Sequence, residues 1–129
     1  MKNSFKLFHF FHSLFIFFVL ILLTGCGSGL RFGGVVRFED GTPVQGASVS
    51  FIDTKNQYDG QTDAQGKYTL TGATPKDGIP PGHYNVAVSM PADDNGKSVL
   101  PEKYASPDTS GLTCDVQSGS TFDIIIEKN

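Results

Sequence analysis

The sequence of 129 residues is poor in the residue types on which several functions depend. It has no tryptophan, and only three histidines, of which His83 alone lies beyond residue 25. Without tryptophan the chain lacks the largest aromatic platform for a sugar. A single imidazole leaves no histidine pair for catalysis or zinc binding. With 10 basic and 13 acidic residues there is no basic excess either, so nucleic acid is not expected as a partner.

Long helical patterns are also missing. Beyond residue 26 no apolar pattern of helical period runs for ten residues or more. Short stretches instead alternate apolar with polar residues, and glycine-rich and proline-rich segments separate them, with all seven prolines in this part of the chain. Such alternation and punctuation are typical of a β-protein with many turns.

The first 25 residues are strongly apolar. Lys2 and Lys6 precede an apolar segment in which Leu14 to Leu23 is uninterrupted, and small residues follow at once. This is the layout of a secretory signal peptide. A transmembrane helix needs about 20 apolar residues, and the uninterrupted run is half that long. We therefore predict a cleaved signal peptide over residues 1–25, with an uncleaved anchor as the alternative.

The end of this segment, Leu23-Thr24-Gly25-Cys26, resembles the lipobox of bacterial lipoproteins. The resemblance implies that the Cys26 thiol receives a diacylglycerol, that cleavage falls just before Cys26, and that a fatty acid such as palmitate acylates the new amino terminus. Residues 26–31 would then be a lipidated tether. Two or more acyl chains hold a protein stably at a membrane. We expect the cell membrane or the outer membrane, with the exported domain outside the cytoplasm.

Cleavage would leave 104 residues, enough for one domain. The loss of Lys2 and Lys6 would make its net charge −5. Cys114 would remain without a partner for an intramolecular disulfide, so it is either a reactive thiol or a small buried hydrophobe. Since Leu112, Cys114 and Val116 alternate with polar residues, we favour burial.

Seven short segments show the alternation of strands with one apolar face. They are residues 35–38, 47–52, 61–62, 67–70, 83–89, 112–116 and 122–127. Residues 53–59 are interpreted as a loop. Since each strand has a single apolar face, two sheets must stack those faces against one another. The predicted fold is therefore an all-β, antiparallel, seven-stranded sandwich.

Four spaced motifs resemble the carboxypeptidase regulatory-like domain. In order they are Gly34-Val35-Val36, residues 41–49 (GTPVQGASV), residues 62–68 (TDAQGKY) and residues 81–86 (PGHYNV). The resemblance implies a transthyretin-like (prealbumin-type) sandwich, which we place at residues 32–129. It further implies a noncatalytic accessory or adhesion-type module, and it supplies no ligand.

No catalytic residue, cofactor or metal site is predicted. The transthyretin-like hydrolases of hydroxyisourate use paired histidines, an arginine and a Tyr-Arg-Gly-Ser ending, whereas this chain ends in Glu127-Lys128-Asn129. His83 falls on the polar face of its strand and is interpreted as solvated. Two oxygen-rich segments, residues 93–96 (DDNG) and residues 59–63 with Asp59 and Asp63, could supply calcium ligands. Neither has EF-hand spacing, and we interpret both as turns.

The segment from Met90 to Gly111 is the remaining candidate site. About 22 residues without a strand pattern are unusual in a small domain and are often functional. Lys103 and Tyr104 could form a binding surface on this loop. Alternatively, Tyr104 and Leu100 cover the core.

The predicted function is that of a lipid-anchored, noncatalytic cell-envelope module, structural or binding, whose partner is an envelope protein or a polysaccharide. One alternative is a carbohydrate-binding module, for which Tyr58 and Tyr104 are the candidate exposed aromatics. A second, disfavoured alternative is a transthyretin-like hydrolase.

Overall fold

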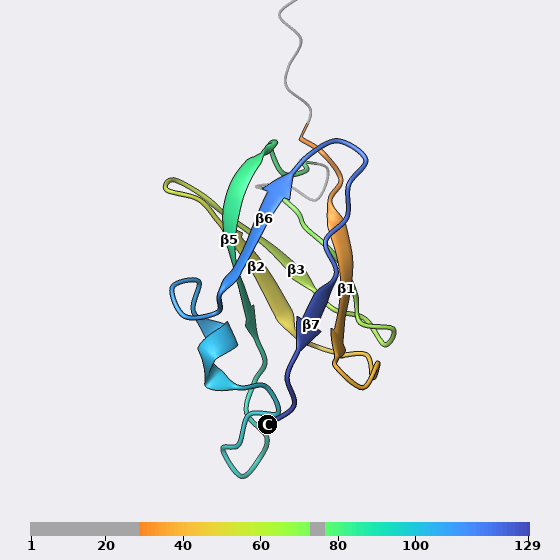
Figure 1. Ribbon diagram of the computed structural model, residues 1–129, viewed down its shortest axis with the longest axis vertical. Helices are drawn as coiled ribbons and strands as arrows, with labels where there is room; N and C mark the ends of the chain where they lie inside the picture. Colours follow the sequence, from red (N-terminus) through yellow and green to blue (C-terminus); the bar gives the residue numbers. More distant parts are fainter. Residues whose placement is uncertain (1–28, 73–76) are drawn as a thin grey trace, which may run out of the picture.

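The computed structural model describes residues 29–72 and 77–129 (Figure 1). The predicted signal peptide, the lipobox residues Leu23, Thr24 and Gly25, and the lipidation residue Cys26 lie outside the described residues. Within these two ranges, no helix is long and apolar enough to cross a membrane.

The described residues form two β-sheets that pack face to face (Figure 1). One sheet has the order β4-β1-β7 and the other the order β3-β2-β5-β6. The elements in chain order are β1 (Gly33–Phe38), β2 (Ser48–Ile52), β3 (Gln57–Gln61), β4 (Lys67–Thr69), β5 (Gly82–Ser89), the 3-10 helix η1 (Glu102–Ala105), β6 (Leu112–Val116) and β7 (Ile124–Ile126). The all-β class and the two-layer arrangement agree with the prediction.

The core lies between the sheets and is centred on Phe51 of β2. Its ring has four aromatic neighbours, with centroids 5.7 Å away for Phe32, 6.1 Å for Tyr84, 6.1 Å for Phe122 and 6.3 Å for Tyr68. These rings come from both sheets and from the residues that precede β1 and β7. Aromatic pairs in such tilted and edge-to-face arrangements stabilise a core beyond the area that they bury.

The alternation in β5 is confirmed. The inward side chains of this strand are buried and most of the outward ones are exposed. The buried set is Tyr84, Val86 and Val88, and the exposed set is His83, Asn85 and Ser89. Ala87, which the alternation places on the same face as His83 and Asn85, is buried as well, and it lies opposite Ser50 of β2 in the register.

The prediction of a wholly antiparallel fold is wrong for one pair of strands. Strand β7 runs parallel to β1, with Val36 opposite Ile124 and Phe38 opposite Ile126. After β6 the chain crosses from the four-stranded sheet to the other sheet (Figure 1). There β7 lies beside β1 and runs in the same direction as β1. Alternation in a sequence tells which face of a strand is buried, but not the direction of the neighbouring strand.

Interpreting residues 53–59 wholly as a loop was also wrong. Strand β3 pairs with β2 over five residues, from Ile52 opposite Gln57 to Ser48 opposite Gln61. Its sequence, Gln-Tyr-Asp-Gly-Gln, has one apolar side chain and sits at the edge of the sheet. The pairing of β3 with β2 rests on backbone hydrogen bonds, which leave little trace in the hydropathy pattern.

Cys114 is a buried free thiol, as predicted. It lies on the inner face of β6, opposite Tyr84 of β5. Burial raises the pKa of the thiol, because the thiolate would lose its hydration. The residue therefore belongs to the core.

Candidate functional site

The sandwich has two different ends along its long axis. The first described residues enter at the top in Figure 1, where the loop between β6 and β7 also turns. The C terminus and the loop after β5 lie at the bottom. We call residues 29–34 and 117–123 the proximal end, and residues 90–105 with 127–129 the distal end. The distal end contains the long loop that the sequence marks as a candidate site.

Of the two expectations for this loop, the structure places Tyr104 and Leu100 over the core. Tyr104 is 5% exposed and Leu100 is 2% exposed, and both belong to the main hydrophobic cluster. The Tyr104 hydroxyl oxygen accepts a hydrogen bond from the Glu127 backbone N–H at 3.4 Å. Tyr104 is thus unable to present its ring as a contact surface.

Lys103 is exposed, but its charge already has a partner. Its Nζ lies 2.6 Å from the Glu127 carboxylate and 5.0 Å from the centroid of the Tyr104 ring. The hydrogen bond to Glu127 raises the pKa of the Lys103 ammonium. Lys103 therefore ties η1 to the segment after β7.

The C-terminal residues fasten the distal end in two further places. Lys128 Nζ lies 2.8 Å from the Asp40 carboxylate and 5.4 Å from the centroid of the Phe38 ring. The Lys128 ammonium and the Thr42 N–H hold the pKa of the Asp40 carboxyl far below its usual range. The Asn129 side-chain amide donates to the Ser98 carbonyl at 3.3 Å.

The carboxylates of the two candidate calcium segments already accept hydrogen bonds. Asp93 and Asp63 do so in turns, as interpreted, whereas the interpretation of a turn is wrong for Asp59, which lies in strand β3. Asp93 Oδ1 accepts the backbone N–H groups of Asn95 and Lys97, each at 2.9 Å. These bonds lower the pKa of the Asp93 carboxyl. Asp63 accepts two backbone N–H groups in the same way, and Asp59 accepts from Gln57 and from a serine of β2. In the described ranges no group of three or more acidic, histidine or cysteine side chains is arranged to hold a metal ion.

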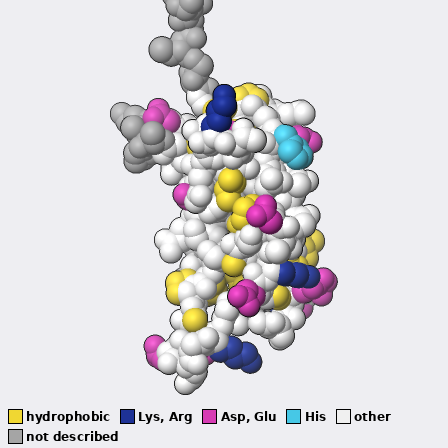
Figure 2. All heavy atoms as spheres, turned by 90° about the vertical axis from the view of Figure 1, so that its left-hand side faces the viewer, with side chains coloured by type: hydrophobic (Ala, Val, Ile, Leu, Met, Phe, Trp, Pro, Cys, Tyr) yellow, Lys and Arg dark blue, Asp and Glu magenta, His cyan; other side chains and the backbone are white. Residues whose placement is uncertain are grey.

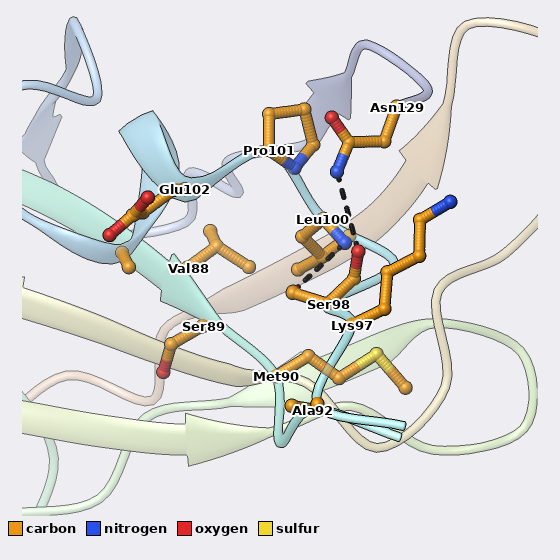
Figure 3. Close-up of a pocket in the computed structure, with 12 residues that line it drawn as sticks. Val88, Ser89, Met90, Ala92, Lys97, Ser98, Leu100, Pro101, Glu102 and Asn129 are labelled. Atoms are coloured by element: carbon orange, nitrogen blue, oxygen red, sulfur yellow. Dashed lines mark hydrogen bonds between the residues drawn. The ribbon is translucent and has the colours of Figure 1, made fainter. Parts of the chain in front are cut away.

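A cavity of about 500 Å³ opens at the distal end. This is within the range of sites that hold small ligands or short polymer segments. Its lining comes from the end of β5, the loop that follows, η1 and the C terminus (Figure 3). The residues are Val88, Ser89, Met90, Ala92, Gly96, Lys97, Ser98, Leu100, Pro101, Glu102, Ala105 and Asn129.

The lining combines an apolar floor with opposite charges. Val88 and Leu100 lie between Glu102 on one side and Lys97 on the other in Figure 3, with Met90 below. Lys97 and Glu102 are both exposed, and neither forms an ion pair with another described residue. Figure 2 shows side chains of both signs on the lower half of the molecule. The sequence signals this site only through the length of the 90–111 loop, because the charges come together with the apolar residues only in the folded chain.

His83 does not line this cavity and lies on the outer face of β5. Its Nδ1 lies 2.7 Å from the Asp115 carboxylate of β6, and both side chains are more than half exposed (Figure 2). Cys114, the neighbour of Asp115, points to the opposite face and into the core. The structure therefore does not bring His83 and the Cys114 thiol together on one face of the sheet.

Tyr58 also differs from the exposed aromatic that a sugar platform would need. It is partly buried, and its ring packs edge-on against Tyr84 with centroids 5.9 Å apart. Since Tyr104 is buried as well, neither tyrosine proposed for a carbohydrate-binding module stands open on the surface.

Comparison with known proteins gives one match. A family described as the carboxypeptidase regulatory-like domain matches residues 31–124, which run from just before β1 to the first residue of β7. No curated protein and no solved structure matches the chain.

Proposed function

Because the chain belongs to the carboxypeptidase regulatory-like domain family, we propose that it is a lipid-anchored, noncatalytic module of the cell envelope. In this proposal Cys26 carries the lipid, and the transthyretin-like sandwich holds a protein or polysaccharide partner. The single observation that carries the proposal is the position of the distal cavity, at the end of the sandwich opposite the entry of the chain.

The length of the segment before the sandwich supports this orientation. An extended chain spans at most about 3.5 Å per residue, so Gly29 would lie within about 10 Å of the lipidated cysteine. The proximal end of the sandwich would then face the membrane and the distal end would face away from it. A partner in the envelope would meet the distal cavity first.

The surroundings of His83 support a noncatalytic role. Its partner Asp115 is exposed, and water weakens such a pair. A catalytic imidazole needs a nucleophile or a substrate atom within hydrogen-bond reach. The thiol nearest to it in the sheet, Cys114, points into the core.

Lipid anchoring is tested with Cys26→Ser. We expect the variant to lose labelling by a radioactive fatty acid and to leave the membrane fraction. Cys114→Ser is the matched control and should keep both the label and the membrane location. Labelled Cys26→Ser protein in the membrane would contradict the anchoring proposal. In a separate experiment, fractionation of the native protein shows whether it is located in the cell membrane or in the outer membrane.

The orientation is tested with a photo-crosslinking amino acid at Ala92 in the distal end, and in a second protein at Thr121 in the proximal end. Both positions are exposed. We expect a defined adduct of the partner from position 92 and none of that mass from position 121. The same adduct from both positions, or only from position 121, would argue against a distal binding site.

A further inference from the structure

The end of β5 has no neighbouring strand on the side of the cavity. Strand β6 begins at Leu112, opposite Val86, so in the described residues nothing in β6 lies opposite Val88 or Ser89. The Ser110 hydroxyl ends the ladder, because it donates to the Val86 carbonyl and accepts the Leu112 N–H. The last residues of β5 therefore lack a neighbouring strand on this side, and the cavity begins there.

The alternation of hydrogen-bonding directions along β2 shows which way the backbone N–H and C=O groups of β5 face. Ala47 donates to and accepts from Thr62 on the β3 side of β2. Since hydrogen-bonding directions alternate along a strand, Ser48 and Ser50 of β2 face β5, and Val88 faces away from β2. Val88 itself is fully buried. By the same alternation the N–H and C=O groups of Ser89 face Ser48 of β2, so the part of this edge that an extended chain can reach is Met90, which borders the cavity.

The charges at the cavity distinguish among polymers. A neutral polysaccharide would leave both Lys97 and Glu102 without a partner. A uniformly anionic polymer would meet Lys97 favourably but Glu102 unfavourably, and a cationic polymer the reverse. A polypeptide segment can carry both signs with apolar side chains between them.

We infer that the distal cavity binds an extended polypeptide segment of a partner protein. The segment lies beside Met90, places an apolar side chain over Leu100, and directs an acidic side chain to Lys97 and a basic one to Glu102. This inference rests on the proposed function, since it names the partner class of the same site. It selects a protein partner over a polysaccharide.

The test uses the full-length protein in detergent and a displayed library of random seven-residue peptides. We expect enriched peptides that carry one acidic and one basic residue on either side of apolar residues. A synthetic copy of an enriched peptide, measured by fluorescence polarisation, should bind about tenfold more weakly to Lys97→Glu and to Glu102→Lys. Lys55→Glu, in the turn between β2 and β3, is the control and should leave Kd unchanged.

The double variant Lys97→Glu/Glu102→Lys gives the sharpest result. It should recover binding to a peptide in which the acidic and basic residues are exchanged, which a merely structural effect would not produce. Both side chains are exposed, so equal urea midpoints should confirm that the variants fold.

Each contrary result has a definite meaning. If no peptide is enriched, or if enriched peptides bind equally well to all the variants, the inference is wrong. If a glycan array binds the protein and the peptide library does not, the polypeptide partner is excluded while the proposed envelope module stands. Membrane-bound Cys26→Ser protein would instead overturn the anchoring and leave the peptide result unaffected.

Discussion

The two ends of the sandwich are held together in different ways. At the proximal end backbones touch each other: a Cβ on Gly34 would lie 2.0 Å from the Phe122 carbonyl oxygen, and one on Gly78 would lie 2.0 Å from that of Leu30. At the distal end a Cβ on Gly96 would meet nothing within 4 Å. There, charged side chains make the connections, as in the pair of Lys103 with Glu127.

This difference separates support from recognition. Backbone packing leaves no room for a side chain at Gly34 or Gly78, so these contacts are suited to a fixed position. Side-chain contacts at the distal end leave a cavity whose charges are available to a ligand.

The largest effect is expected from Gly34→Ala, which would break the proximal packing. The new methyl group must displace the Phe122 carbonyl, and such overpacking costs about 3 kcal/mol of unfolding free energy. Gly96→Ala is the distal counterpart. Its φ of +76° favours glycine, so alanine there should cost about 1 kcal/mol through backbone strain alone. Urea unfolding measures both, and equal losses would remove the contrast between the ends.

A smaller effect is expected in the core that both ends share. Val86→Ala removes two methyl groups from a fully buried site and should cost about 2 kcal/mol. His83→Ala, three residues earlier on the exposed face, should change stability by about 0.5 kcal/mol or less, since exposed ion pairs contribute little. A large loss of unfolding free energy for His83→Ala would show that the pair of His83 with Asp115 stabilises the fold.

Alkaline pH should destabilise the protein through the proximal end. Burial raises the pKa of the Tyr68 phenol, which donates to the Phe122 carbonyl at 2.6 Å. The unfolded chain releases this proton near pH 10 while the folded chain keeps it, so stability is complete below that pH and falls above it. We expect a loss of about 1 kcal/mol by pH 11, measured by urea unfolding. Tyr68→Phe should have a shallower decline; an unchanged slope would exclude Tyr68 as its source.

The smallest effect is expected from acid at the distal end. The Lys97 and Asn95 N–H groups lower the pKa of Asp93, so the turn is stabilised above the usual aspartate pKa, about 4, and loses this contribution as pH falls through the lowered value. In an NMR titration, the amide protons of Asn95 and Lys97 should shift together below pH 4. Asp93→Asn should abolish the shift. A titration that survives this substitution would identify another group as its cause.

Sequence reasoning succeeded where a feature depends on neighbours along the chain. The period of two in β5 predicts which of its side chains are buried, and the same alternation predicts the burial of Cys114. It failed for β3, in which Tyr58 is the only large apolar residue and backbone pairing to β2 makes the strand. It left the role of Tyr104 open, because burial of that ring depends on contacts with the segment after β7 and with the core, far away in sequence.

The sequence by itself determined the all-β class, the inner and outer faces of most strands and the family motifs, because strand period and turn chemistry are local properties. Only the tertiary structure decided that β7 lies parallel to β1, and that Lys97 and Glu102 stand across an apolar floor closed by the C terminus. These features depend on which distant segments meet. Packing of the whole core decides which segments meet, and no short stretch of the sequence specifies this.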